Sequence, residues 1–139
     1  MIDDSEDMRV LLGVALERSG EFSVVAEAAD GVEGVAAVKA FQPDLVLLDI
    51  AMPVMDGMQA LPLIRDECPT AVVVMVSAFG DSSGLPQRAM ALGANGYICK
   101  GAGHLRALPE QLRVIVAAVT AERAAVTSRH KASPSPIVP

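Results

Sequence analysis

One short apolar run and the acid that follows it constrain the fold of this chain more than any other feature. Residues 45–48 are consecutive aliphatic side chains, and turn-forming residues stand on both sides of them. Pro43 precedes the run, and Pro53 and Gly57 follow it. A short apolar run with such flanks is typical of a strand that is covered on both faces, as in a parallel sheet.

Asp49 ends this run, and two interpretations of it are open at this point. An ionised carboxylate beside a buried strand is costly unless it lies at an open edge with partners. In open α/β sheets such an edge lies beyond the carboxyl ends of the strands, where binding sites form. Aspartate also caps turns, which is the purely structural explanation for this residue.

Composition indicates one acidic domain with an aliphatic core. The 139 residues are a one-domain length, 52% of them are hydrophobic and only 3% are aromatic. The net charge of −6 argues against nucleic-acid binding, which needs a basic face. No apolar run reaches the roughly 18 residues of a membrane span, and the acidic N-terminus is unlike a signal peptide. Because Cys68 and Cys99 are too few for a disulfide framework, we expect a cytoplasmic, reduced protein.

Strand and helix patterns alternate along the chain. Apolar spacing predicts helices over residues 8–19, 32–41, 57–67, 86–92 and from 105 onward, and β-prone runs predict strands over 22–28, 45–48, 71–76 and 96–99. Pro62 interrupts the third helical pattern, so we expect a late or irregular start there. The alternation predicts a doubly wound parallel sheet with helices on both faces. Only Met1 and Ile2 precede the first acids, so the first strand is almost missing.

The predicted strands end in residues that suit one reaction. Asp3 and Asp4 follow the vestigial first strand, and Asp49, Ser77 and Lys100 follow the last three strands in turn. Parallel strands bring these ends to one edge of the sheet. Three carboxylates there repel one another unless a cation joins them, and Mg²⁺ favours such oxygen ligands together with phosphate oxygens. With a lysine and a hydroxyl beside the metal, the arrangement predicts phosphoryl transfer to an aspartate.

These motifs resemble the receiver domain of two-component response regulators. The resemblance spans about residues 3–120 and is carried by Asp3-Asp4, by LLDIAMPVMDG from Leu47 to Gly57, by Val76-Ser77-Ala78 and by GANGYICK from Gly93 to Lys100. It implies a flavodoxin-like, five-stranded parallel sheet in the order 2-1-3-4-5 with helices on both faces. The first strand of that sheet is truncated in this chain.

For the site, the resemblance implies that Asp49 is the phosphoacceptor and that Lys100 binds the phosphoryl group. Asp4 and Asp49 would bind Mg²⁺ with the backbone carbonyl of Ala51, and Asp3 would act mainly through water. The implied donor is a sensor histidine kinase or a phosphotransfer protein, and the implied output is a downstream protein or effector domain. A second copy of this chain, forming a homodimer, is a further partner that the resemblance leaves open. The chain would not be an enzyme beyond self-phosphorylation and autodephosphorylation.

The resemblance also implies a switch made by Ser77 and Tyr97. New charge on Asp49 would draw in the Ser77 hydroxyl, and Tyr97 would rotate into the vacated space. That would bias a two-state protein-interaction surface. The structural alternatives are an ordinary strand-end hydroxyl for Ser77 and a core-edge side chain for Tyr97.

Other functional classes fit the motifs less well. A phosphohydrolase of the haloacid dehalogenase type needs a second acid where Ala51 stands. A flavodoxin-like FMN binder needs a Ser/Thr/Gly phosphate loop where Asp3 and Asp4 stand. A phosphorylation-independent receiver-like interaction module and a fragment of a longer DNA-binding regulator stay open as alternatives.

The two ends of the chain carry further expectations, and the first strand departs from the family pattern. Loss of the first strand leaves backbone groups of its neighbours unpaired, at about 1–3 kcal/mol each against a total stability of about 5–15 kcal/mol. We expect that a start site placed too late explains the loss. At the other end, we expect a receiver domain over residues 1–126 and a disordered Ser/Pro-rich tail over 127–139, too short for a DNA-binding effector domain.

Overall fold

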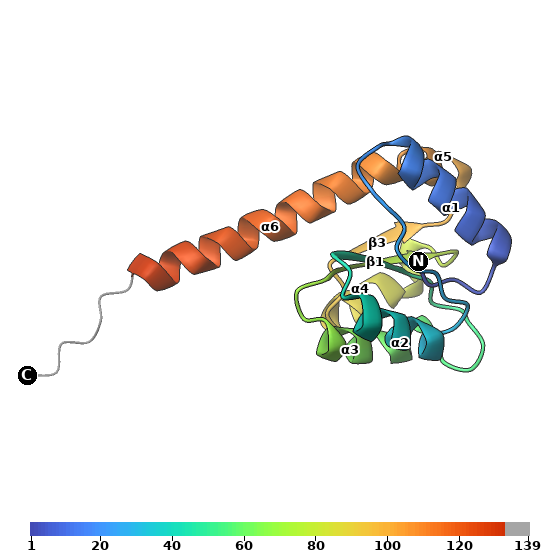
Figure 1. Ribbon diagram of the computed structural model, residues 1–139, viewed down its shortest axis with the longest axis horizontal. Coiled ribbons are helices and arrows are strands. Elements are labelled where there is room, and N and C mark those ends of the chain that lie inside the picture. Colours follow the sequence, from blue (N-terminus) through green and yellow to red (C-terminus); the bar gives the residue numbers. More distant parts are fainter. Residues whose placement is uncertain (133–139) are drawn as a thin grey trace, which may run out of the picture.

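A parallel sheet between two helical layers makes up the body of the protein (Figure 1). The computed structural model describes residues 1–132. In chain order the elements are α1 (Glu6–Arg18), α2 (Gly31–Phe41), β1 (Leu45–Leu48), α3 (Gly57–Glu67), β2 (Val72–Ser77), the 3₁₀ turn η1 (Asp81–Ser83), α4 (Leu85–Ala91), β3 (Gly96–Cys99), α5 (Ala102–Arg106) and α6 (Leu108–Ala132). The predicted architecture of a parallel sheet with helices on both faces is confirmed.

The regular sheet contains three parallel strands in the order β1-β2-β3. Leu45 of β1 pairs with Val72 of β2, and Val74 of β2 pairs with Gly96 of β3. Every residue of the central strand β2 is buried. All three strands were predicted within one residue at each end, because each is an apolar run bounded by turn-forming residues.

The expected strand over residues 22–28 is absent from the described part of the chain, and that prediction is wrong. What remains at this edge are two isolated bridges, in which Ile2 pairs in parallel with both Ala28 and Leu48. The Ile2 amide donates to Leu47 O at 2.9 Å, and the Ala28 amide donates to Met1 O at 2.9 Å. Because residues 1–3 provide only this short stretch of backbone, the segment before Ala28 has no ladder to join.

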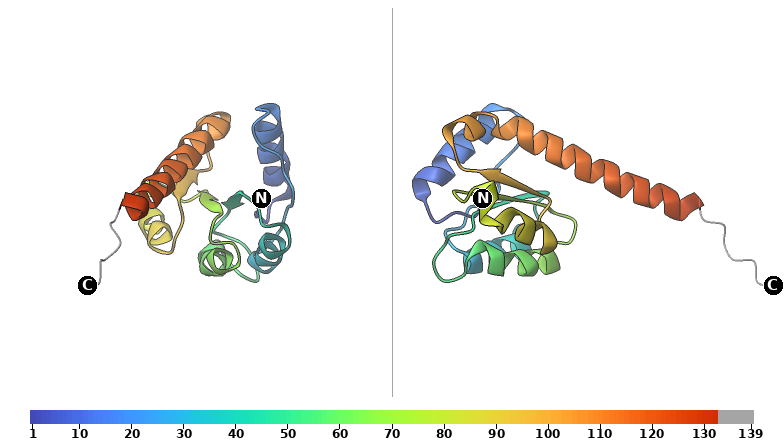
Figure 2. Two further views of the ribbon diagram at one scale, coloured as in Figure 1. Left: turned by 60° about the vertical axis from the view of Figure 1, so that its left-hand side comes forward. Right: turned by 180° about the vertical axis from the view of Figure 1, so that it is seen from behind.

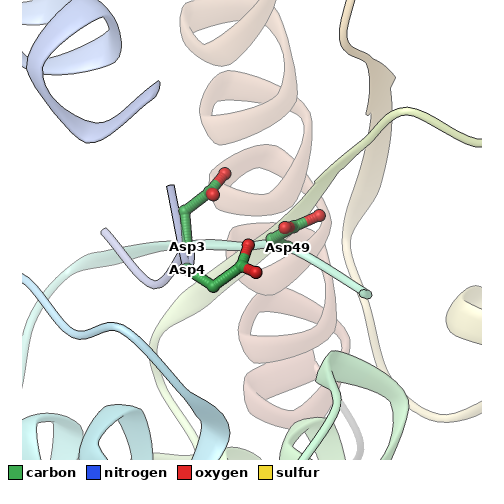
Figure 3. Close-up of side chains that lie close together, drawn as sticks. All are labelled: Asp3, Asp4 and Asp49. Atoms are coloured by element: carbon green, nitrogen blue, oxygen red, sulfur yellow. The ribbon is translucent and has the colours of Figure 1, made fainter. Parts of the chain in front are cut away.

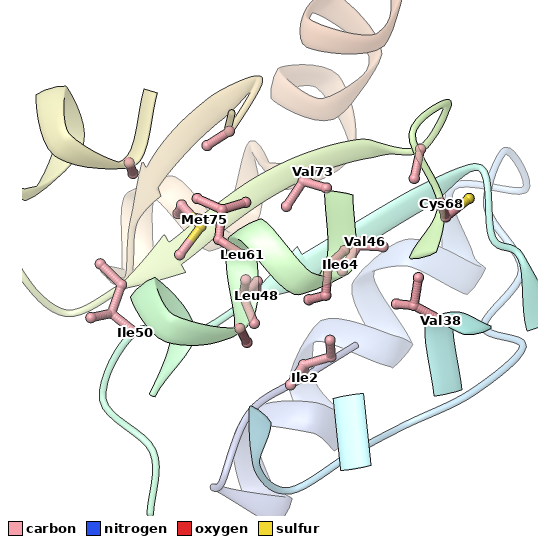
Figure 4. Close-up of a cluster of buried hydrophobic side chains, with 14 of the residues drawn as sticks. Ile2, Val38, Val46, Leu48, Ile50, Leu61, Ile64, Cys68, Val73 and Met75 are labelled. Carbon is pink, nitrogen blue, oxygen red and sulfur yellow. The ribbon is translucent and has the colours of Figure 1, made fainter. Parts of the chain in front are cut away.

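Alternating side chains of the strands enter two separate cores. Val46, Leu48, Val73 and Met75 pack against α2 and α3 in one core, which also holds Ile2 (Figure 4). The other core holds Leu47, Val72, Val74 and Val76 together with apolar residues of α1 and α6. A strand buried on both faces needs a continuous apolar run, which is why these segments show no polar alternation.

Side-chain caps set the starts of three helices. Ser5 accepts from the amide of Met8, Asp30 from Glu33 and Asp56 from Gln59, which satisfies amides that have no partner inside a helix. In α3 the Gln59 side chain also accepts from the Asp56 amide, completing a capping box. The helix therefore begins at Gly57 and continues through Pro62, and the expected late or irregular start is wrong.

The last helix, α6, runs well beyond the rest of the domain (Figures 1 and 2). Leu108 and Leu112 are fully buried near its start, whereas every residue from 120 to 131 is exposed. Residues 127–132 are helical, so the disorder expected there is not found; residues 133–139 lie outside the described residues. Within residues 1–132, none of the helices combines the length and apolar character that crossing a membrane requires.

Candidate functional site

Three acids meet at the carboxyl-terminal edge of the sheet (Figure 3). Asp3 and Asp4 follow the Ile2 bridges, and Asp49 follows β1. One carboxylate oxygen from each of the three lies within 4.8 Å of the others. Asp3 and Asp49 are only 2% and 5% exposed, whereas Asp4 is exposed. The predicted acidic cluster is therefore present, with one side open to solvent.

The backbone around Asp49 is held tightly. Its amide donates to Ile2 O at 2.9 Å, and its Oδ1 accepts from the Ile50 amide at 2.8 Å. Gly57, at the start of α3, lies so close that a Cβ there would be 2.0 Å from Asp49 O. The Gly57 amide also donates to Ile50 O at 2.8 Å. The close approach of α3 to the site therefore requires glycine at this position.

Asp3 is positioned by contacts that the sequence reasoning missed. Its Oδ1 accepts from the Ser5 amide at 2.9 Å, and its carbonyl oxygen accepts from the Arg9 guanidinium at 2.6 Å. Arg9 also lies 3.5 Å from a carboxylate oxygen of Glu27. Arg9 sits one turn into an amphipathic helix, so its sequence context gave no signal that it reaches back to the site.

Lys100 enters the cluster from the end of β3. Its Nζ lies 2.6 Å from Asp3 Oδ2 and 3.1 Å from Asp49 Oδ2. Burial raises the pKa of the Asp49 carboxyl, and the Lys100 ammonium opposes that rise. Burial alone would lower the pKa of Lys100, but its hydrogen bonds and charge pairing with Asp3 and Asp49 hold that pKa above its ordinary value.

The donor set fits a divalent cation. Three carboxylates against one ammonium leave an excess of negative charge in a small volume. Hard oxygen ligands, two buried and one exposed, are the type that Mg²⁺ uses while it keeps several waters. Ala51 lies two residues beyond Asp49 and is exposed, in the loop that follows β1.

Ser77 is fully buried at the end of β2, next to the last residues of β3. Its carbonyl oxygen accepts from the Lys100 amide at 2.7 Å, and its Oγ accepts from the Phe79 amide at 3.2 Å. The Tyr97 hydroxyl donates to Phe79 O at 2.8 Å and is only partly buried. The predicted site residues thus fall into two groups: the acids with Lys100, and Ser77 with Tyr97 around the backbone of Phe79.

Comparison with known proteins agrees with this geometry. The response regulator receiver domain family model matches residues 1–113. The chemotaxis protein CheY of Halobacterium salinarum is 41% identical over 100 residues, which are 72% of this chain and 81% of that protein. The protein-glutamate methylesterase/protein-glutamine glutaminase of Natronomonas pharaonis is 40% identical over 105 residues, or 76% of this chain. The matched region is 29% of that relative, so this chain corresponds to only a part of it.

A solved structure of a CheX–CheY–BeF3–Mg²⁺ complex from Borrelia burgdorferi contains a similar fold. The likeness has a TM-score of 0.71 at 34% sequence identity and covers 81% of this chain and 84% of that one. The family match, the parallel sheet with its helical layers and the acidic edge agree with one another. The chain belongs to the response regulator receiver family and has its flavodoxin-like fold.

Proposed function

We propose that this chain is a phosphoacceptor receiver domain in which Asp49 takes a phosphoryl group from a histidine kinase or a phosphotransfer protein. The observation that carries the proposal is the position of the Asp49 carboxylate. It is 5% exposed, lies 3.1 Å from the Lys100 ammonium and shares one edge with two further acids. A carboxylate beside a lysine and a cation site is suited to phosphoryl transfer.

In the transfer step, an Asp49 carboxylate oxygen forms a bond to phosphorus as the bond from phosphorus to the donor's histidine nitrogen breaks. The bonding electron pair stays on the imidazole nitrogen. Lys100 would bind an oxygen of the incoming group, and the contacts of its ammonium with Asp3 and Asp49 support this role. The incoming group would replace Asp49 Oδ2 as one of the partners of the Lys100 ammonium.

Asp3, Asp4 and Asp49, with the carbonyl of Ala51, would hold Mg²⁺ at this edge. When bound, Mg²⁺ neutralises charge on the transferring group and helps to orient it. The oxygen donor set supports this assignment, and Mg²⁺ is part of the Borrelia burgdorferi complex that resembles this chain. Arg9 and Ser5 hold Asp3 in place by binding its carbonyl and its Oδ1.

Ser77 and Tyr97 form the proposed switch. The phosphoryl group on Asp49 would attract the Ser77 hydroxyl, which now accepts from the Phe79 amide. Because Tyr97 is held by Phe79 O, a shift of that backbone segment would release Tyr97 and change the surface of β3 and α6. The output would be a downstream protein or effector domain that reads this surface.

A second candidate function is a phosphorylation-independent receiver-like module. It is favoured by one observation, the edge of the sheet beside β1, where Ile2 makes the only bridges among the described residues. Such an edge suits binding of another chain. The two candidates differ in whether Asp49 is ever phosphorylated.

Acid-labile labelling by radioactive acetyl phosphate distinguishes them. The wild type should be labelled in the presence of Mg²⁺. When EDTA is added before acetyl phosphate, the wild type should not be labelled. Asp49→Asn should not be labelled. Asp44→Asn is the matched control, because Asp44 is an exposed aspartate at the opposite end of β1, and it should be labelled like the wild type. No labelling of the wild type, or labelling of Asp49→Asn, would reject the phosphoacceptor proposal.

A further inference from the structure

Arg9 lies one turn into α1 and links this helix to two other segments. Its Nη1 donates to Asp3 O at 2.6 Å, and its Nε lies 3.5 Å from Glu27 Oε1. The Arg9 side chain is 17% exposed, whereas that of Glu27 is 50% exposed. Because a guanidinium presents its N–H groups in a rigid fork, one arginine can hold a backbone carbonyl and a carboxylate at the same time.

The carbonyl that Arg9 binds belongs to the peptide group between Asp3 and Asp4. A peptide group is planar, so a hydrogen bond to its oxygen fixes the orientation of the whole group, including the Asp4 amide. The Asp3 carboxylate has other partners, the Ser5 amide at 2.9 Å and the Lys100 ammonium at 2.6 Å. Arg9 therefore acts on the link between two acids of the cluster.

Asp4 depends on this link because it has no hydrogen-bond partner of its own. Within residues 1–132, its amide, its carbonyl oxygen and its carboxylate form no hydrogen bond or ion pair. Yet one of its carboxylate oxygens lies within 4.8 Å of those of Asp3 and Asp49, although Asp4 is exposed. The backbone on either side of Asp4 therefore sets the direction of its carboxylate, and Arg9 holds the side toward Asp3.

The charge of Arg9 and its position predict opposite effects on a bound cation. A guanidinium beside three carboxylates lowers their attraction for a divalent cation, so loss of the charge alone would tighten cation binding. If Arg9 acts by its position, its loss lets the peptide group between Asp3 and Asp4 turn, and the Asp4 carboxylate leaves the cluster. Cation binding would then weaken, in spite of the more negative site. The sign of the change distinguishes the two effects.

We propose that Arg9 is a positioning residue for the cation site and that it acts through Asp4. By binding Asp3 O, it fixes the peptide group that carries the Asp4 amide and keeps the Asp4 carboxylate directed toward Asp49. Glu27 pairs with the same guanidinium and holds it from the more exposed side. The proposal rests on the cation site of the proposed function, but it does not require phosphorylation of Asp49.

Titration of the full chain with Mg²⁺, in the absence of a phosphodonor and at constant ionic strength, tests the sign. Arg9→Met should weaken Mg²⁺ binding by about tenfold, as loss of a residue that orients a metal ligand typically does. Arg9→Lys keeps the charge and one donor, so it should recover part of that loss. Arg18→Met is the matched control, because it removes the same charge from an exposed arginine in the last turn of α1, and it should bind Mg²⁺ like the wild type.

A double-mutant cycle shows whether Arg9 acts through Asp4. Asp4→Asn removes the carboxylate that Arg9 is proposed to direct, and it should weaken Mg²⁺ binding by itself. In that background, Arg9→Met should change the Mg²⁺ affinity by less than about twofold, because the group on which Arg9 acts is already lost. An equal tenfold loss in both backgrounds would place the action of Arg9 elsewhere.

NMR relaxation measures the hold on the backbone directly and without Mg²⁺. The order parameter of the Asp4 amide should be about 0.85 in the wild type and should fall toward about 0.6 in Arg9→Met. Arg18→Met should leave it unchanged. Urea denaturation of the same samples shows whether each variant is folded. If Arg9→Met does not fold, Arg9→Lys replaces it, with smaller losses expected in both the order parameter and the Mg²⁺ affinity.

Three results would overturn the proposal. The first is Mg²⁺ binding by Arg9→Met that equals or exceeds that of the wild type, since only the charge of Arg9 would then matter. The second is an equal loss with and without the Asp4 carboxylate, and the third is an unchanged order parameter of the Asp4 amide. Labelling by acetyl phosphate is measured separately: a wild type that binds Mg²⁺ but is not labelled would reject the phosphoacceptor proposal and leave the role of Arg9 standing.

Discussion

Replacement of Gly57 by alanine should damage both the stability and the phosphorylation of this protein. A Cβ at this position would lie 2.0 Å from Asp49 O, 2.8 Å from Asp49 C and 2.9 Å from Ile50 Cα. All three atoms belong to the backbone, so no side chain can rotate away to make room. Either α3 or the segment that carries Asp49 must move by about 1.5 Å to reach ordinary contact distances.

The cost follows from the contacts that this movement disturbs. Overpacking of a tight site costs about 1–3 kcal/mol, and weakening the bond from the Gly57 amide to Ile50 O adds about 0.5–1.5 kcal/mol. Alanine in a helix recovers up to about 1 kcal/mol relative to glycine. The expected net loss in the free energy of unfolding is therefore about 1–4 kcal/mol, a large fraction of a typical total of about 5–15 kcal/mol.

Urea denaturation of Gly57→Ala measures the loss, and acetyl phosphate labelling of the folded variant measures the effect on Asp49. Gly103→Ala in α5 is the matched control, because a Cβ there would meet nothing within 4 Å. That variant should be unchanged or slightly stabilised and should be labelled normally. A Gly57→Ala protein as stable as the wild type, or labelled at the same rate, would refute the reasoning from close approach.

Three further substitutions probe the site. Lys100→Met leaves the carboxylates of Asp3 and Asp49 without the lysine ammonium that pairs with them. The free energy of unfolding, measured in urea with EDTA, should fall by about 3 kcal/mol, and labelling should slow. No loss of stability would contradict the pairing. Phe79→Ala removes an aromatic ring two residues beyond Ser77. Because water would then reach the phosphoryl group more easily, the label should be lost faster after the donor is removed. An unchanged half-life of the label would contradict a shielding role for the ring. Tyr97→Phe removes the hydrogen bond from the Tyr97 hydroxyl to Phe79 O. The free energy of unfolding in the same assay should fall by only about 0.5–1.5 kcal/mol, and labelling should be kept. Abolished labelling would place Tyr97 in the transfer step.

The parts of the fold that the sequence predicted well are those with a strong local signal. Residues 45–48 and 71–76 are uninterrupted apolar runs with turn residues around them, and both form strands of the sheet. Asp49 and Lys100 directly follow such strands, so their meeting at one edge followed from parallel pairing alone. The local pattern and the tertiary arrangement agree at these positions.

The errors arise where a distant partner decides the outcome. Residues 22–28 have the composition and alternation of a strand, but strand formation needs a neighbour, and within residues 1–132 only Met1, Ile2 and Asp3 bond the backbone at the end of this segment. At Pro62 the capping box of Asp56 and Gln59 starts the helix early enough to override the unfavourable proline. No local signal marks the approach of Gly57 to Asp49, because it depends on how α3 packs on the sheet.

The projecting half of α6 can act as a lever on the scale of the whole domain. Its base lies against β3, where Val114 and Ile115 share a surface depression with Tyr97, and residues 120–131 are exposed. Within this exposed part, Arg123 donates to Thr70 O at 2.6 Å, and at about 1.5 Å per residue the helix continues for roughly 13 Å beyond Arg123. A tilt of about 10° at Arg123 would displace the far end by roughly 2 Å. A small rearrangement around Tyr97 would thus be amplified into a movement large enough for a second molecule to detect.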